Sequence, residues 1–189
     1  MFKANQQKEI TNYYNANGYS VIEPIVTLNE LKRISDVIDD RMDNFKLGSS
    51  RVVDMNDLAL KIEDVLPLIF KNQYIQIVKK VLGTNYLDLQ HSKYNSKDPS
   101  GGSRVPIHQD FPFFPHTDGR ILGFNFHIDG SSSENGGMYV YPGSWDRPLP
   151  HDDTSKGFKE IGDKSLAGKE KVHFECKPGG VTLHSSFIP

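Results

Sequence analysis

The spacing of hydrophobic residues predicts helices in the first half of the chain. Residues 5–16 are mostly polar with a few apolar residues on one side, and Gly18 is suited to end a helix there. The alternating stretch that follows, 19–24, predicts a short strand. Thr27-Leu-Asn-Glu30 has the sequence of a capping box, and it opens a stretch to residue 45 with apolar residues at helical spacing.

Residues 54–83 predict one or two further helices. Pro67 suits the first turn of a helix, and two lysines lie just before Gly83, where cations interact favourably with the helix dipole. We therefore expect residues 1–83 to be mostly helical.

From residue 84 onward the chain consists of short runs separated by Gly, Pro and Asn. This pattern is typical of an antiparallel sandwich or barrel. We expect residues 151–170, which are charged and poor in apolar residues, to be a surface loop. The expected strands lie within residues 86–94, 105–110, 121–129, 137–141, 171–176 and 180–184. The fold class predicted is mainly β with flanking N-terminal helices.

Composition excludes several classes of protein. A length of 189 residues suits one domain. The net charge of −2 and a pI of about 6.4 argue against a nucleic-acid binder that works by bulk charge. No apolar run approaches the roughly 20 residues that span a membrane, and the N-terminus lacks the apolar core of a signal peptide. The single cysteine, Cys176, excludes an intrachain disulfide and a multi-cysteine zinc site, so we expect a cytoplasmic protein.

A His-x-Asp pair carries the candidate chemistry. On a strand, His108 and Asp110 would project from the same face, and one imidazole and one carboxylate could bind one metal ion. A distant histidine, His184, follows a Pro-Gly-Gly turn and could complete the facial triad typical of non-haem Fe(II) oxygenases. A solvent-facing strand, or a histidine hydrogen bonded to its neighbouring carboxylate, would explain the pair equally well. On the expected strand 121–129, Asn125 and Phe126 face opposite ways, so only one of them can line a cavity.

With these residues in view, the chain resembles the phytanoyl-CoA dioxygenase family. The resemblance covers most of the chain and rests on five segments in a fixed order. They are Gly18-Tyr-Ser-Val-Ile22, Lys97-Asp-Pro-Ser-Gly-Gly102, His108-Gln-Asp-Phe-Pro-Phe-Phe-Pro115, Glu134-Asn-Gly-Gly-Met-Tyr-Val-Tyr-Pro-Gly-Ser144 and Lys177-Pro-Gly-Gly-Val-Thr-Leu-His-Ser-Ser186.

The resemblance implies a double-stranded β-helix (jelly-roll, cupin-like) core and an enzyme dependent on Fe(II), 2-oxoglutarate and dioxygen. Such enzymes hydroxylate a small organic substrate and release succinate and carbon dioxide. His108, Asp110 and His184 would hold the iron. Ser186 matches a family serine that can donate to the cosubstrate carboxylate, and Lys97 and Tyr94 are further cosubstrate candidates. Nucleic acid and membrane partners are not expected, whereas substrate identity and oligomeric state stay open.

Two departures from the family pattern qualify this picture. Trp145 stands where the family usually has a histidine. Family members also bind the far carboxylate of 2-oxoglutarate with an arginine beyond the distal histidine, but only five residues follow His184. Arg104 or Arg120 could substitute for it. We expect residues 1–189 to form one oxygenase domain, whose jelly-roll region, 84–189, lacks its last strands.

Two other functions are compatible with the same residues. One is a non-catalytic jelly-roll protein that binds metal or acts as a scaffold. The other is a metal-dependent hydrolase or cupin-like isomerase that uses the three ligands without 2-oxoglutarate.

Overall fold

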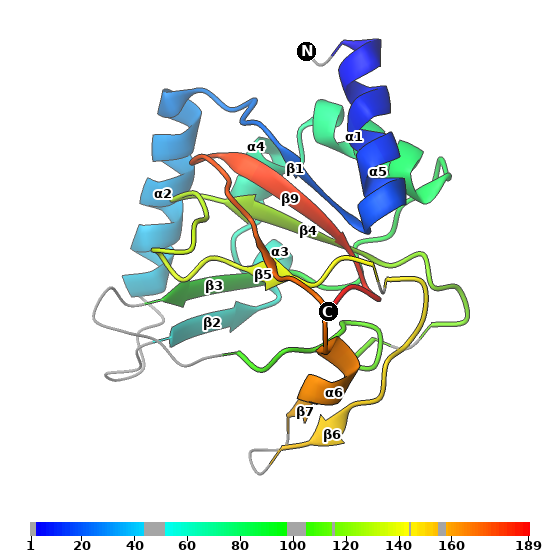
Figure 1. Cartoon of the computed structure of the whole chain (residues 1–189). Coiled ribbons are helices and arrows are strands. Elements are labelled where there is room, and N and C mark those ends of the chain that lie inside the picture. Colours follow the sequence, from blue (N-terminus) through cyan, green and yellow to red (C-terminus); the bar gives the residue numbers. More distant parts are fainter. Residues whose placement is uncertain (1–2, 44–51, 98–104, 115, 144, 155–157) are drawn as a thin grey trace.

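The computed structural model describes residues 3–43, 52–97, 105–114, 116–143, 145–154 and 158–189. Its centre is a three-stranded antiparallel sheet in the order β1 (Tyr19–Ile22), β9 (Gly180–Ser185) and β4 (Leu122–His127). In Figure 1 the first and last strands of the chain lie side by side in this sheet. The register pairs Tyr19 with His184 on one side of β9 and Gly123 with His184 on the other.

The first two helices begin where the sequence predicts, and the first of them also ends there. Helix α1 (Ala4–Asn17) stops at Gly18, whose φ of 80° lies in the left-handed region that glycine adopts without strain. Helix α2 (Leu28–Asp43) opens with the predicted capping box. The backbone N–H of Thr27 donates to the Glu30 carboxylate at 2.8 Å, and the N–H of Glu30 donates to the Thr27 hydroxyl at 3.2 Å. Residue 45, the end of the predicted segment, lies outside the described residues.

The predicted helical segment 54–83 is more broken than expected. It contains α3 (Leu58–Lys61), the 3-10 turn η1 (Glu63–Val65), α4 (Leu66–Ile69) and α5 (Asn72–Leu82). Pro67 lies in the first turn of α4, and α5 ends at Gly83 with a left-handed φ of 63°. The beginning of the segment was wrongly predicted as helix, because it belongs to β2 (Val52–Asn56), which pairs with β3 (Lys93–Lys97).

One face of the central sheet is covered by these helices. Strand side chains such as Val181, Leu183 and Phe124 pack against Tyr74 and Ile77 of α5. A neighbouring cluster joins α2 and the short helices to the same sheet face, and its buried members are Ile34, Ile38, Leu58, Ile62, Val65 and Ile69. Alternation along β9 therefore sends Thr182 and His184 to the opposite face.

Three predicted segments differ from the structure. Residues 105–110 run irregularly rather than as a strand, and only the end of segment 86–94 is strand, in β3. The segment 151–170 is not a simple surface loop, because Ile161 and Leu166 are buried. It contains β6 (Asp152–Asp153), β7 (Lys159–Glu160) and α6 (Asp163–Leu166). The predicted runs 137–141 and 171–176 contain β5 (Tyr139–Val140) and β8 (Val172–His173), which pair with each other.

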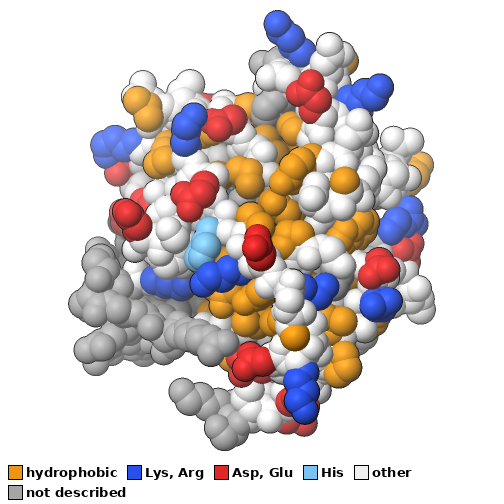
Figure 2. Space-filling model, viewed as in Figure 1, with side chains coloured by type: hydrophobic (Ala, Val, Ile, Leu, Met, Phe, Trp, Pro, Cys, Tyr) orange, Lys and Arg blue, Asp and Glu red, His pale blue; other side chains and the backbone are white. Residues whose placement is uncertain are grey.

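The face turned to the viewer in Figure 2 carries positive and negative side chains interspersed, on both sides of a central hydrophobic band. Among the described residues, no helix is both long and apolar enough to cross a membrane.

Candidate metal centre

His108 and Asp110 lie in an irregular segment that is held by single contacts from several directions. The N–H of Ile161 donates to the carbonyl of Ile107 at 2.8 Å, and the N–H of Phe111 donates to the carbonyl of Ser186 at 3.0 Å. Because these partners come from different regions of the chain, no ladder forms and the segment is not a strand.

The segment brings the Asp110 carboxylate beside His184, on the face of the sheet opposite the helices. His184 Nε2 lies 3.0 Å from Asp110 Oδ2, although the two residues are 74 positions apart. His108 Nε2 lies 3.5 Å from Asp110 Oδ1. The structure thus brings together the three predicted metal ligands. All three side chains are partly or largely withdrawn from solvent, His184 most strongly.

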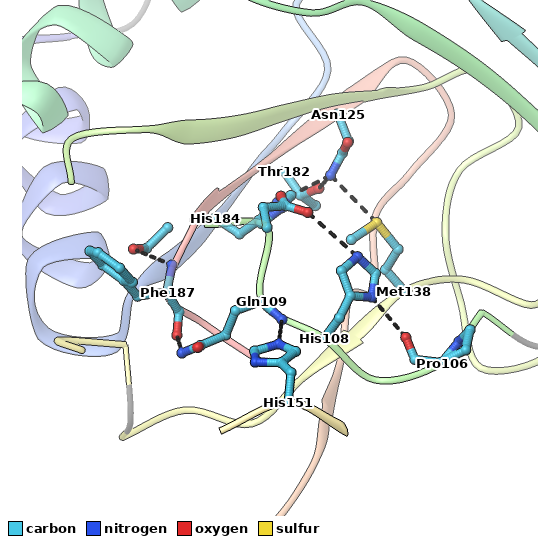
Figure 3. Close-up of polar contacts among 11 residues, drawn as sticks. Pro106, His108, Gln109, Asn125, Met138, His151, Thr182, His184 and Phe187 are labelled. Atoms are coloured by element: carbon cyan, nitrogen blue, oxygen red, sulfur yellow. Dashed lines mark hydrogen bonds and ion pairs between the residues drawn. The ribbon is translucent and has the colours of Figure 1, made fainter. Parts of the chain in front are cut away.

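The hydrogen bond at Nδ1 of His108 determines what its other ring nitrogen, Nε2, can bind. Its Nδ1 lies 2.7 Å from the Pro106 carbonyl, which can only accept, so Nδ1 carries a proton (Figure 3). In the neutral ring, Nε2 then presents a lone pair toward a carboxylate oxygen, and two lone pairs repel. A cation must lie between them, either a proton on Nε2 or a metal ion bound by both groups.

The pKa shifts of Asp110 and His108 also favour a negatively charged carboxylate beside a positive charge. Burial opposes the charge on Asp110, but hydrogen bonds from His108 and His184 outweigh it and hold the pKa of Asp110 far below its usual range. Burial also opposes the charge on His108, and the Asp110 and Pro106 contacts overcome it, so the pKa of His108 is raised. The carboxylate is therefore charged at any physiological pH.

The second nitrogen of His184 faces strand β4. Asn125 Nδ2 lies 3.3 Å from His184 Nδ1 and 3.4 Å from the Thr182 hydroxyl (Figure 3). His127, next along the same face of β4, contacts the Thr182 hydroxyl at 2.9 Å. Burial, with a smaller contribution from His184, lowers the pKa of His127, so this imidazole is neutral near pH 7. A row of neutral polar groups thus lies beside His184.

The separations suit adjacent ligands of one metal ion. Two ligand atoms that each bind a metal at about 2.1 Å, at right angles, lie about 3 Å apart. The distances of 3.0 Å from His184 Nε2 to Asp110 Oδ2 and 3.5 Å from His108 Nε2 to Asp110 Oδ1 are close to this value, although each involves a different carboxylate oxygen. Among the described residues, no group of three or more histidine, cysteine or acidic side chains is already arranged to hold a metal ion, and Asp110 contacts imidazole directly. A metal ion would replace the protons in these contacts.

The three predicted cosubstrate residues occupy different surroundings. Ser186 is fully buried two residues beyond His184, and its hydroxyl has no hydrogen-bond partner among the described residues. The Lys97 ammonium donates to the carbonyl of Gly136 on an exposed region of the surface. Tyr94 packs against the hydrophobic cluster that includes Ile34 and Ile38 of α2, and burial raises the pKa of Tyr94. Of the three, only Ser186 is a buried polar group available to a ligand.

Of the other residues singled out in the sequence, Asn125 faces the cluster and the other described ones lie away from it. Phe126 packs into the core, so Asn125 is the member of that pair that faces the site, as alternation requires. Trp145 packs against Tyr14 and the backbone of Gly18. Arg120 is exposed and paired with Asp118, whereas Arg104 lies outside the described residues.

Sequence reasoning missed the residues that support the cluster. Gln109 is completely buried and is hydrogen bonded to three backbone groups. Phe158 lies with its ring 5.1 Å from that of His108, edge to face. The sequence hinted at a supporting role for Gln109 only through its position between His108 and Asp110. Its hydrogen-bond partners are too far away along the chain to be predicted.

The geometry of these residues can be compared with known proteins. The sequence profile of the phytanoyl-CoA dioxygenase (PhyH) family matches residues 14–188. The chain belongs to the phytanoyl-CoA dioxygenase family. A curated relative, a probable alpha-ketoglutarate-dependent hypophosphite dioxygenase from Stutzerimonas stutzeri, is 29% identical over 161 residues, which cover 75% of this chain and 53% of that protein. The chain spans about half the length of the curated relatives it matches.

Solved structures share the fold of this family member. The non-haem alpha-ketoglutarate-dependent carbocyclase SnoK from nogalamycin biosynthesis superimposes with a TM-score of 0.82 at 18% identity, over 96% of this chain and 75% of that one. EctD from S. alaskensis, solved with 2-oxoglutarate and 5-hydroxyectoine, gives a TM-score of 0.78 at 20% identity, over 99% of this chain and 68% of that one. At this level of identity the likeness concerns the fold.

Proposed function

We propose that this chain is the iron-binding region of an Fe(II)- and 2-oxoglutarate-dependent dioxygenase that hydroxylates a small organic substrate. The observation that carries the proposal is the convergence of two imidazole nitrogens, His108 Nε2 and His184 Nε2, on the Asp110 carboxylate. Membership of the phytanoyl-CoA dioxygenase family supports the same function. A jelly-roll core within one domain, with the mostly helical residues 1–83 packed on it, belongs to this proposal, and the cytoplasmic location stays a prediction.

In this proposal each ligand has a defined task. His108 offers Nε2 because the Pro106 carbonyl holds the proton on Nδ1. Asp110 supplies a permanently charged oxygen, which lowers the net charge of the bound ion. His184 offers Nε2 from the rigid strand β9, and the contact of its Nδ1 with the Asn125 amide orients the ring.

Iron and 2-oxoglutarate, when bound, supply the oxidation, in which decarboxylation to succinate and carbon dioxide is coupled to hydroxylation of the substrate. The chain's own contribution is to orient the ligands and to limit water at the site. In this proposal Ser186, whose hydroxyl has no hydrogen-bond partner among the described residues, donates to a cosubstrate carboxylate. Lys97 and Tyr94 remain candidates for cosubstrate binding, but neither is described in contact with the three metal ligands. Lys97 donates to Gly136, and Tyr94 packs against the hydrophobic cluster that includes Ile34 and Ile38 of α2.

The proposal is tested by iron binding and by turnover. The wild-type protein should bind one Fe(II) per chain under anaerobic conditions and release succinate from 2-oxoglutarate in the presence of Fe(II), ascorbate and candidate substrates. Asp110→Ala should lose Fe(II) while keeping its circular dichroism spectrum. Asp118→Ala, which removes an exposed carboxylate, is the matched control and should bind iron normally.

The outcomes separate the possible functions. Iron binding without 2-oxoglutarate turnover, across a broad substrate panel, would favour a metal-binding protein or a metal-dependent hydrolase or isomerase. Loss of iron in His108→Ala and Asp110→Ala, but not in His184→Ala, would mean that the third ligand is another residue. Unchanged iron stoichiometry in Asp110→Ala would overturn the site.

A further inference from the structure

Gln109, between the two ligands of the His-x-Asp motif, is completely buried. Its side chain points toward Phe187, whereas its backbone N–H faces His151 (Figure 3). A buried amide is stable only when its donors and acceptor are all paired, so its partners reveal what it holds together.

The amide of Gln109 has all of these partners, and they come from two distant segments. Its Nε2 donates to the carbonyl of Arg147 at 3.0 Å and to the carbonyl of Phe187. Its Oε1 accepts from the N–H of Leu149 at 2.7 Å. Because two carbonyls face Nε2 and one N–H faces Oε1, only this orientation of the amide satisfies every group.

The backbone of Gln109 is held by the same loop. Its N–H donates to His151 Nε2 at 3.0 Å, and His151 Nδ1 lies 2.8 Å from the Leu149 carbonyl, which fixes the imidazole. One residue thus bonds the 147–151 loop through its side chain and its backbone. Through Phe187 it also bonds the segment that follows His184.

Two of these segments are joined again through Phe111. The N–H of Phe111 donates to Ser186, and the rings of Phe111 and Phe187 lie 4.6 Å apart. These contacts connect the segment with Asp110 to the segment after His184, and the Gln109 amide is the polar group buried at their centre.

We propose that Gln109 is a positioning residue of the metal centre. It fixes the His108–Asp110 pair relative to His184 by bonding the backbone of Phe187 on one side and the 147–151 loop on the other. The inference rests on the proposed function, because it assigns a supporting residue to that metal site. Without the amide, the contacts left between these two segments are the Phe111–Ser186 hydrogen bond, the Phe111–Phe187 ring contact and the direct contact of Asp110 with His184.

The test measures metal binding without turnover. Mn(II) affinity is measured from the electron paramagnetic resonance signal of the unbound ion, for the wild-type protein and for Gln109→Met and Gln109→Glu. Met keeps the volume and removes all three side-chain hydrogen bonds, whereas Glu keeps the acceptor for Leu149 and loses both donations. Both variants should bind Mn(II) about 10- to 100-fold more weakly, the usual loss when a residue that orients metal ligands is changed.

A second readout separates positioning from a loss of stability. The visible absorption spectrum of the Co(II)-loaded protein reports the arrangement of the ligands, and a merely destabilised variant below its melting temperature would give the wild-type spectrum. We expect Gln109→Met to change the spectrum. Gln76→Met, on the exposed surface of α5, is the matched control and should change neither readout. His151→Ala leaves the amide in place and should shift both readouts in the same direction by less.

The results distinguish two failures. If the wild-type protein binds Mn(II) no better than Asp110→Ala, the proposed function fails and the inference with it. If the wild-type protein binds Mn(II) and a folded Gln109→Met matches it in affinity and Co(II) spectrum, the inference alone is wrong. Should neither Gln109 variant fold, His151→Ala decides, and wild-type behaviour of that variant would overturn the inference.

Discussion

The imidazole of His184 has room at the site because the residue opposite it has no side chain. Gly123 pairs with His184 across β4 and β9. A Cβ placed on Gly123 would lie 2.7 Å from His184 Nδ1 and nearer still to two other ring atoms. Since real carbon contacts are not this short, any side chain at position 123 must displace the ring.

Gly123→Ala should therefore move His184 away from Asp110 and lower Mn(II) affinity about tenfold or more, as changes around metal ligands commonly do. The control is Gly162→Ala, since Gly162 has a φ of −68° and a Cβ there meets only the end of the Asp152 carboxylate at 3.3 Å. Wild-type Mn(II) affinity in a folded Gly123→Ala would contradict the placement of His184.

The only cysteine of the chain, Cys176, is half-buried, and burial, helped by Glu23, raises the pKa of its thiol to about 11. The thiolate is the reactive form, so at pH 8 its population falls on the order of a hundredfold below that of an ordinary cysteine. We expect iodoacetamide to alkylate the native protein correspondingly slowly at pH 8, and the urea-unfolded protein at the rate of a free thiol. Equal rates in the two states would contradict this environment.

Sequence reasoning reached the residues with local or periodic signals and missed those with distant partners. The spacing of His108, Asp110 and His184 predicted a cluster that the structure brings together. Gln109 gave no such signal, because its partners lie 38, 40 and 78 positions away. The pairing of Gly123 with His184, which leaves room for the imidazole, likewise depends on the strand register, and only the folded sheet defines that register.

At the scale of elements, the ends of helices were predictable because capping is local. The N-terminus of α2 carries both halves of its capping box within four residues. The prediction of a strand at residues 105–110 was wrong because the backbone hydrogen bonds of this segment go to partners in different parts of the chain, including the His151 side chain. Strand β2 was missed because the strand with which it pairs, β3, lies about 40 residues further along the chain.

The start of α2 provides a prediction of stability and its pH dependence. Glu30 accepts from Thr27 and pairs at 2.6 Å with Lys71, the residue before α5. The Lys71 hydrogen bond first, then those from Thr27, lower the pKa of Glu30 from 4.5 to about 2. Thr27→Ala should cost about 1 kcal/mol of unfolding free energy. Glu30→Gln should also destabilise the protein at neutral pH.

The pH dependence has a definite sign. A carboxylate with a lowered pKa in the folded state stabilises the protein above about pH 4.5, and this stabilisation is lost as the pH falls toward 2. The difference in unfolding free energy between the wild type and Glu30→Gln, measured in urea, should therefore shrink across this range. A difference that stays constant from pH 6 to pH 2.5 would exclude the proposed contribution of the charge.

At the scale of the whole molecule, the site ties together segments that are far apart along the chain. Strand β1, near the N-terminus, pairs with β9, and β9 carries His184 to the segment with Asp110, 74 positions earlier. The helices cover one sheet face, so the polar residues that alternate with the core gather on the other. Function and folding are therefore coupled through β9, whose six residues are all buried.

This coupling predicts that a bound divalent ion stabilises the fold. A ligand that binds only the folded state at 100 times its dissociation constant adds about 2.7 kcal/mol, and for a chain of this size each kcal/mol raises the melting temperature by about 2–4 °C. Saturating Mn(II) should therefore raise the melting temperature of the wild type by roughly 5–10 °C. The same addition should leave Asp110→Ala unchanged, whereas Asp118→Ala, whose carboxylate pairs with exposed Arg120, should respond like the wild type. A shift of equal size in Asp110→Ala would place the stabilising ion elsewhere on the molecule, and no shift in the wild type would mean that the two segments are not joined by a metal.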